Sequence, residues 1–181
     1  QWSSSAASDV YKRQINTLVG NEGDSGDKVN LDSDYVATLS DTTITATVLN
    51  AVDGNVPGTV NASTVATITG SAADINTAYA SSGFSGLGDE AVTIDDTSIA
   101  ASVLNTLNSN TTGLVTATSV ATLTGTASAI TTLIGNEGTS GDKVALDTDF
   151  AMTVSSGTAT VDQANTMAAF ATTGEITATI S

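Results

Sequence analysis

The residues best suited to chemistry are carboxylates in two loops of nearly the same sequence, NEGDSGDKVNLDSDY at 21–35 and NEGTSGDKVALDTDF at 136–150. Calcium prefers carboxylate and carbonyl oxygens, and turns that contain glycine can bring several of them around one ion. These two loops are therefore the candidate calcium sites: if calcium binds, we expect it there and not in the shorter segment 83–90. The predicted ligands are Glu22, Asp24, Asp27, Asp32 and Asp34 in the first loop and Glu137, Asp142, Asp147 and Asp149 in the second.

A second interpretation of the same loops is that they are solvated turns, which keep an acidic protein in solution. Neither the EF-hand pattern nor a glycine-rich nonapeptide pattern occurs in them. Both interpretations stay open at the level of sequence.

Catalytic chemistry has little to work with in this chain. It contains no His and no Cys that could act as base or nucleophile. Lys28 and Lys143 lie in the acidic loops, where neighbouring carboxylates favour their protonated forms. We therefore expect that the protein is not an enzyme and that it has no cofactor other than calcium.

Threonine patterns are the other candidate binding feature. Thr-Ala-Thr occurs at 45–47, 116–118 and 177–179, and ranks of threonines on a flat sheet could bind ice or carbohydrate. We expect the first to lie in a helix and the other two in strands, so the favoured interpretation is threonine as a strand former facing water. The patterns Asn61-Ala-Ser63 and Asn110-Thr-Thr112 match the glycosylation acceptor, but we interpret them as turn residues.

The charge of the chain excludes several partners. Its 181 residues include 19 acidic and 4 basic ones, a formal net charge of −15. Nucleic acid and anionic membranes both need a basic surface, so neither is an expected partner. No apolar run approaches the roughly 18 residues of a membrane-spanning helix. Without cysteine the fold cannot rely on disulfides.

Internal repeats dominate the chain. Residues 49–75 match residues 104–130 at an offset of 55, and the two acidic loops are offset by 115. The second offset fits a 55-residue unit followed by a 60-residue unit, with the extra five residues in the acidic loop. The sequence thus predicts about three units of 55–60 residues.

Each unit divides into two similar halves. A stretch rich in β-branched residues ends in an apolar anchor, and a small hydroxyl residue follows within a few positions. That residue suits a helix N-cap, and the next ten or so residues have helical periodicity. The anchors and caps, in order, are Leu39 and Thr42, Ile68 and Ser71, Ile94 and Thr97, Leu123 and Thr126, and Val154 and Thr158.

These halves predict an α/β fold, a right-handed solenoid of strand and short-helix rungs, each about 26–31 residues long, with a parallel ladder. The anchors should then stack at about the 4.8 Å spacing of parallel strands. All-β solenoid or β-sandwich repeats are the alternatives. The neighbouring repeats of the same chain are the expected partners.

The beginning of the chain differs from the rest. Residues 4–14, SSAASDVYKRQ, resemble the translation of a transposase-based sequencing adapter and hold two of the four basic residues. Ile15 aligns with Ile75 and Ile130, which lie inside repeats. We therefore expect residues 1–14 to be a disordered artefact, and residues 15–181 to be a solenoid truncated at both ends.

The repeats also support a family resemblance. The strings TTGLVTATSVATLTGTASAI, SDTTITATVLNAVDGN and SSGTATVDQANTMAAFATTGEITATIS resemble repeats of very large cell-surface or secreted proteins of marine bacteria, cyanobacteria included. The resemblance covers essentially all of 15–181. It implies an extracellular or cell-surface, adhesin-like or surface-layer-like role as a stalk or spacer. The alternative role is a surface-binding module for glycan, ice or a substratum, with or without calcium.

Overall fold

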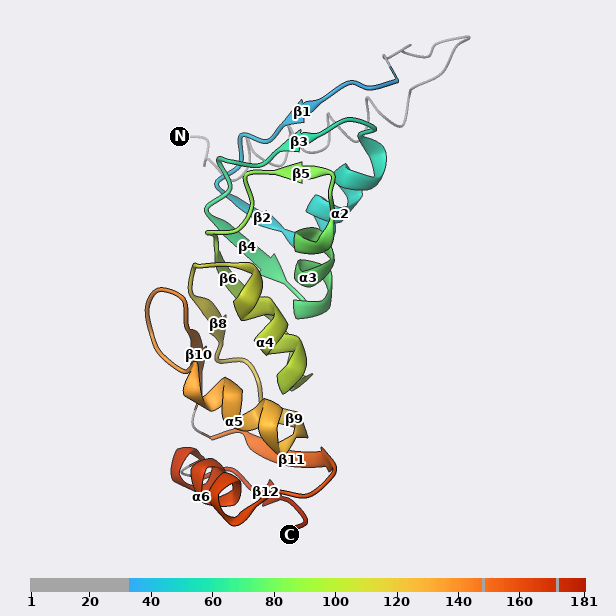
Figure 1. The fold of residues 1–181 in the computed structure, drawn as a ribbon. Helices are drawn as coiled ribbons and strands as arrows, with labels where there is room; N and C mark the ends of the chain where they lie inside the picture. Colours follow the sequence, from blue (N-terminus) through green and yellow to red (C-terminus); the bar gives the residue numbers. More distant parts are fainter. Residues whose placement is uncertain (1–32, 148, 172) are drawn as a thin grey trace.

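A computed structural model describes residues 33–181 of the chain, except Thr148 and Thr172. The described residues form an elongated mixed α/β structure, with strand β1 at one end and helix α6 at the other (Figure 1). Residues 1–14 lie outside the described residues, so their interpretation as an adapter translation stays a prediction.

Strands and short helices alternate along the chain, as the sequence predicts. The helices are α2 (Ala46–Asn55), α3 (Ala72–Ala80), α4 (Ala101–Asn110), α5 (Ala127–Gly135) and α6 (Val161–Phe170). The strands are β1 (Ala37–Thr38), β2 (Thr43–Thr45), β3 (Val60–Asn61), β4 (Thr67–Gly70), β5 (Phe84–Ser85), β6 (Ala91–Ile94), β7 (Ser98–Ala100), β8 (Val115–Ala117), β9 (Thr122–Thr126), β10 (Val144–Leu146), β11 (Ala151–Ser156) and β12 (Ile176–Thr177). The helices rule out the all-β alternative.

The strands form three sheets, ordered β1-β3-β5, β10-β8-β6-β4-β2 and β12-β11-β9-β7. Every strand pair in the described residues is parallel. Parallel neighbours need a crossover connection, which the helices supply. Consecutive helices pack against each other in chain order, from α2 to α6. Parallel pairing throughout also rules out the β-sandwich alternative, which would be antiparallel.

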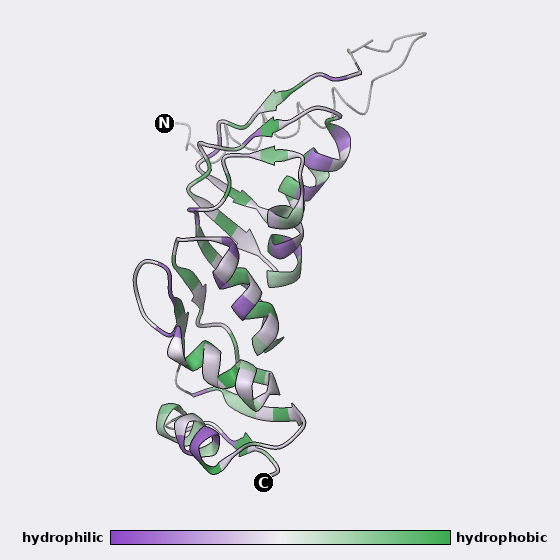
Figure 2. Cartoon of the chain, viewed as in Figure 1, coloured by the Kyte–Doolittle hydropathy of each residue, from purple (hydrophilic) through white to green (hydrophobic). Residues whose placement is uncertain are grey.

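The core is a narrow column between the sheets and the helices. Ile44, Ile68, Val92, Val115 and Val144 occupy the same register on the five strands of the central sheet. None of these side chains is more than 1% exposed. Polar residues alternate with apolar ones along most strands and helices (Figure 2), because each element has one buried face.

The strands also explain why the strict repeat contains two helices. Between α2 and α3 the chain passes through two strands, β3 and β4, but between α3 and α4 it passes through three, β5, β6 and β7. The extra strand β7 moves equivalent residues to the next sheet, and between α5 and α6 the corresponding residue Ala159 forms an isolated bridge with Ile180. Val60 lies in the three-stranded sheet, its equivalent Val115 lies in the central sheet, and Ile176, the next equivalent, lies in the four-stranded sheet. Each repeat is therefore displaced by one sheet relative to the previous repeat.

This displacement overturns the prediction that the five anchors form one column. The anchors concerned are Leu39, Ile68, Ile94, Leu123 and Val154. Ile68 lies opposite Val92, whereas Ile94 lies two residues further along, opposite Gly70. Leu123 and Val154 belong to the four-stranded sheet and differ in register, since Leu123 pairs with Met152. Leu39 follows β1 and lies outside the strands. The sequence spacing counted one strand per helix, and the molecule has two or three.

The predicted helix caps are right at two positions and wrong at three. Ser71 and Thr126 cap α3 and α5, and each side chain accepts a hydrogen bond from the third residue of its helix. Thr42 and Thr97 precede strands β2 and β7, so their helices begin three residues later than predicted. The prediction of Thr158 as the cap of α6 is also wrong, because Thr160 holds that position. The cap positions of α2 and α4 are held by Thr45 and Ala100.

Thr42 and Thr97 have a different role from the one predicted. The carbonyl of Thr42 accepts hydrogen bonds from the amides of Ala66 and Thr67, and the carbonyl of Thr97 accepts from those of Ala121 and Thr122. Each threonine therefore joins its own turn of chain to the next. The following residues stay extended because they pair with β4 and β9.

The placement of the five extra residues is confirmed. Three residues, 81–83, connect α3 to β5, whereas eight residues, 136–143, connect α5 to β10. The longer connection projects from the body beside β10 (Figure 1).

Candidate functional site

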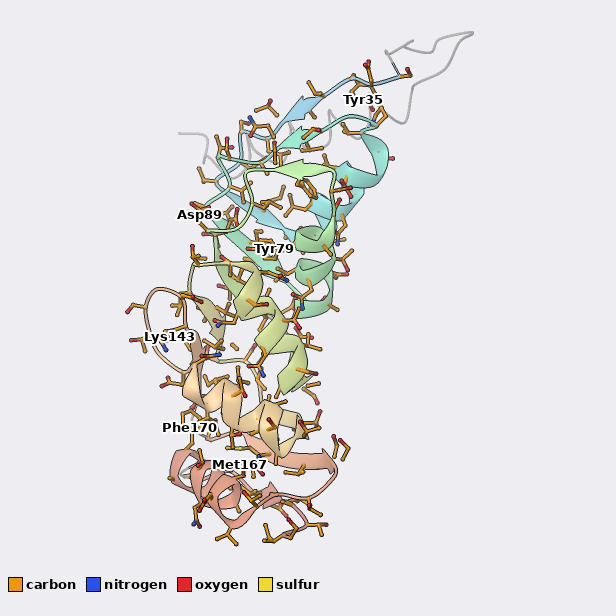
Figure 3. All side chains as sticks on the ribbon, viewed as in Figure 1. Tyr35, Tyr79, Asp89, Lys143, Met167 and Phe170 are labelled. Carbon is orange, nitrogen blue, oxygen red and sulfur yellow. The ribbon has the colours of Figure 1, made fainter. Side chains whose placement is uncertain are left out.

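The second acidic loop begins at the end of α5. Glu137 forms an isolated parallel bridge with Val144, and the amide of Lys143 donates to the carbonyl of Gly141 (2.7 Å). These contacts close the loop on itself, with Lys143 on the projecting segment (Figure 3). Asp142 at its tip is exposed.

The predicted calcium ligands of this loop are not brought together. Glu137 and Asp142 precede β10 in the sequence, whereas Asp147 and Asp149 follow it. Asp147 and Asp149 are exposed. In the part of the chain that the structure describes, no group of three or more acidic side chains is arranged to hold a metal ion. Glu22, Asp24, Asp27 and Asp32 lie outside the described residues, and Asp34 is exposed. Calcium binding stays a prediction.

The threonines are arranged in rows, which the sequence pattern did not reveal. Thr45, Thr69, Thr93 and Thr116 occupy the same register on β2, β4, β6 and β8. Thr45 and Thr93 are exposed, and the other two are half-buried. The expectation that the pattern 45–47 lies in a helix is confirmed for Ala46 and Thr47, which begin α2, and wrong for Thr45, which is the last residue of β2.

A second row lies on the four-stranded sheet. Thr124, Thr153 and Thr177 pair in register on β9, β11 and β12. The placement of Thr116 and Thr177 in strands is confirmed. The two rows therefore lie on two different sheets, and in the second row Thr124 and Thr153 are half-buried.

Asparagines join the helices to one another. In each case a side-chain amide donates to a backbone carbonyl in the first turns of the next helix. The three bonds run from Asn50 Nδ2 to Asp74 O (3.0 Å), from Asn76 Nδ2 to Val103 O (3.3 Å) and from Asn105 Nδ2 to Ala129 O (2.9 Å). Asn50 and Asn105 hold equivalent positions in successive repeats and make the same bond.

Carboxylates take part in the same kind of contact. Asp96 accepts a hydrogen bond from the amide of Ala72, the first residue of α3 (2.7 Å). Asp53 accepts one from the hydroxyl of Ser81 (2.7 Å). Both bonds join one turn of chain to the next, so these acidic residues have a structural partner.

Among the described residues, the most deeply buried acidic one is Glu90, which is 1% exposed. Its Oε2 accepts hydrogen bonds from the hydroxyl of Tyr79 and the amide of Gly88, both at 2.9 Å. Its Oε1 is buried and has no hydrogen-bond partner among the described residues. Burial, and secondarily the neighbouring Glu90 carboxylate, raises the pKa of Tyr79, although a hydrogen bond with Thr111 opposes the shift.

The neighbourhood of Glu90 is a junction between repeats. The Thr111 hydroxyl donates to the Glu90 carbonyl (2.7 Å), and a Cβ on Gly113 would overlap that same carbonyl oxygen. Gly113 therefore has to be glycine because two backbones approach closely there. Tyr79 lies between α3 and the strands, above the acidic loop that carries Lys143 in the view of Figure 3.

The glycosylation patterns have structural partners. The Oδ1 of Asn61 accepts from the amide of Ser63 (3.0 Å), which is the turn geometry expected for this residue. Asn110 is the last residue of α4 and not a turn residue, and its Nδ2 donates to Asn76 Oδ1 (2.9 Å).

Comparison with known proteins identifies no relative. No family model matches the chain, and no curated protein or solved structure matches it significantly. Among the residues that the structure describes, no helix is long and apolar enough to cross a membrane.

Proposed function

We propose that this chain is a structural repeat region of a giant extracellular, adhesin-like or surface-layer-like protein, in which it acts as a stalk or spacer. Its proposed architecture is a right-handed solenoid of about three two-helix repeats. The observation that carries this proposal is the recurrence of one contact, the asparagine bond from the first helix of a repeat to the second, which Asn50 and Asn105 make at equivalent positions of successive repeats.

Such contacts suit a spacer because they are made only between neighbouring turns. Each turn hydrogen-bonds to the turn before and the turn after, so length can increase without a new kind of contact. The elongated body in Figure 1 agrees with this arrangement. The extracellular location is proposed from the resemblance of the repeats to those of large cell-surface proteins.

The way in which the polar side chains are used supports a non-catalytic role. Asn50, Asn105, Asp53 and Asp96 all bond to the neighbouring turn. Their hydrogen-bonding capacity stabilises the stack. We propose that the chain has no enzymatic activity.

Small-angle X-ray scattering tests the spacer proposal. A second copy of residues 91–150 is inserted between Phe150 and Ala151, where Ala151 is the repeat equivalent of Ala91. We expect the maximum dimension to grow by about 10–20 Å, the range set by strand and helix spacings over two turns, at constant cross-section. Growth in all three dimensions would refute an extended array.

A surface-binding module is the second candidate, favoured by the threonine row of the central sheet. Binding of glycans or ice would require the row to be intact, so the double substitution Thr69→Val and Thr93→Val should abolish it. The matched control is Thr106→Val, on the exposed face of α4. Absence of binding by the unmodified chain to a glycan array and to ice would exclude this candidate.

A further inference from the structure

Helix α6 occupies the position in its repeat that α4 occupies in the previous one. Val161 and Ala101, the first residues of these helices, are repeat equivalents. Helix α4 follows β7 of the four-stranded sheet, and α6 follows Ala159, which forms an isolated bridge with Ile180. Their burial differs. Helix α4 buries Ala101, Leu104 and Leu107, whereas α6 buries only Met167. Val161 is 58% exposed, although Ala101 is fully buried.

The turn that follows α4 accounts for its burial. Helix α5 packs against α4, and Asn105 donates to Ala129 O at 2.9 Å. Gly125 lies over the start of α4, where a Cβ would be 3.6 Å from Ala101 Cβ, and it has a φ of +148°. A glycine is favoured there because other residues rarely adopt this φ.

The turn that follows α2 repeats these contacts. Asn50 donates to Asp74 O (3.0 Å). Gly70, with a φ of +128°, lies over Ala46, with 3.8 Å between its ideal Cβ and that of Ala46. Helices α2 and α4 are thus covered in the same way, by a turn that carries a Thr-Gly-Ser or Thr-Gly-Thr sequence and then a helix beginning with Ala.

At the end of the molecule formed by α6 and β12, the equivalents of these contact residues are not covered by a further turn. Asn165, the equivalent of Asn105, is exposed on α6. Strand β12 is the edge of its sheet, whereas its equivalent β8 pairs on both sides. Ile180, beyond β12, is 50% exposed. Met167 and Phe170 mark this end in Figure 3. An open parallel edge beside an exposed helix is a template for pairing with another chain segment.

We propose that this C-terminal face, formed by α6 and the free edge of β12, binds one further turn of the same repeat, of the kind that carries α3 and α5. The face continues an interface already made twice in the molecule, from α2 to α3 and from α4 to α5. The occupant needs a glycine over Val161, a backbone carbonyl within reach of Asn165 and a strand for the edge of β12. The turn of residues 121–146 supplies all three. This inference rests on one part of the proposed function, the stacking of turns. It does not require that the chain acts as a stalk.

A chain extension tests the proposal. Residues 175–181, EITATIS, align with residues 114–120, LVTATSV, so residues 121–146 are appended directly after Ser181 of the full chain. We expect the melting temperature of the extended chain to rise by at least about 3 °C, the shift that roughly 1 kcal/mol causes in a protein of this size. A scrambled appendage of the same composition is the control and should give no rise.

Asn165→Ala makes the test specific. It should lower the melting temperature of the extended chain and leave that of the original chain unchanged. Equal effects in both chains, or an appended segment that proteases remove without any change in melting, would overturn the proposal. So would a two-fold dimer of the original chain that Asn165→Lys dissociates, seen by sedimentation equilibrium. Failure here leaves the scattering test of the spacer proposal unaffected, so the two failures are distinguishable.

Discussion

The two faces of the central sheet are built from the same strands but have different residues and partners. Ile68, Val92 and Val115 point inward on β4, β6 and β8 and are fully buried. Thr69, Thr93 and Thr116 follow them directly in the sequence and lie on the outer face. Both rows run in register along the molecule, so alignment of residues in a row does not by itself indicate a functional surface.

The difference teaches where the register of the turns is specified. A slip of one residue would move the inner row to solvent and the threonines into the core, which is strongly unfavourable. The outer threonines favour strand structure, but they are exposed or half-buried and so define the register less strongly than the fully buried inner row. The inner face and the contacts between helices should therefore dominate stability, and the outer face should tolerate substitution.

The largest expected effect is in the core, to which both the inner face of the sheet and the helices contribute. Leu104→Ala removes a fully buried side chain from α4 and should reduce the free energy of unfolding by about 2–5 kcal/mol. Urea denaturation followed by circular dichroism measures it. Thr106→Ala, on the exposed side of the same helix, is the control. A loss below about 1 kcal/mol for Leu104→Ala would contradict the assignment of the core.

The junction between repeats should be next in size. Tyr79→Phe removes one of the two hydrogen bonds to Glu90 Oε2 and leaves a buried carboxylate less satisfied, at a cost of about 1–3 kcal/mol. Tyr35→Phe is the matched control, because the Tyr35 hydroxyl donates to Asn55 O at an exposed position. Equal losses for both variants would contradict the special role of the junction.

Tyr79 also makes the stability depend on alkaline pH. Because burial raises its folded-state pKa above the ordinary value of 10.0, the unfolded chain loses the phenolic proton first. The part of the free energy of unfolding that depends on neutral Tyr79 is fully present below pH 10 and is lost as the pH rises further. The Tyr79→Phe variant should lack this part of the alkaline loss. Difference absorbance at the tyrosinate band, with and without Tyr79, checks the order of titration.

The asparagine bonds between helices should contribute a smaller amount. Asn105→Ala should reduce the free energy of unfolding by about 1 kcal/mol, the typical net value of a hydrogen bond. Asn165→Ala, the same substitution at the equivalent exposed position of α6, should have almost no effect. Thermal melts of both variants measure the difference, and its absence would show that the bond adds nothing.

The outer face should show the smallest effect. Thr93→Val keeps the shape and β-branching of an exposed strand residue and should change stability by less than about 0.5 kcal/mol. Val92→Thr, the reverse substitution at the adjacent buried position, should cost clearly more because it buries a hydroxyl. Equal effects would remove the distinction between the two faces.

Much of the local structure could be predicted from the sequence, because it depends on short-range patterns. Helical periodicity located all five described helices, and the hydroxyls of Ser71 and Thr126 marked two helix starts. Arrangements in space were harder to predict. Strands β5 and β7 have two and three residues, too few for an alternating pattern, so the extra strand and the displacement between sheets were missed.

The polar contacts could not be predicted for a different reason. Asn50 and Asn105 look like surface residues of amphipathic helices, and only the packing of helices shows that their amides reach the next turn. Glu90 aligns with Tyr35 and Phe150 in the neighbouring repeats, which was a usable signal of burial. The carboxylates of the second acidic loop are close in sequence, but β10 separates them.

The displacement of each repeat by one sheet has a consequence for any longer array. Adding a repeat would rotate the distal end about the long axis as well as moving it along that axis. Residues at the same position of successive repeats would face different directions around the long axis. Gain or loss of one repeat would therefore change the orientation, about the long axis, of the residues that follow it.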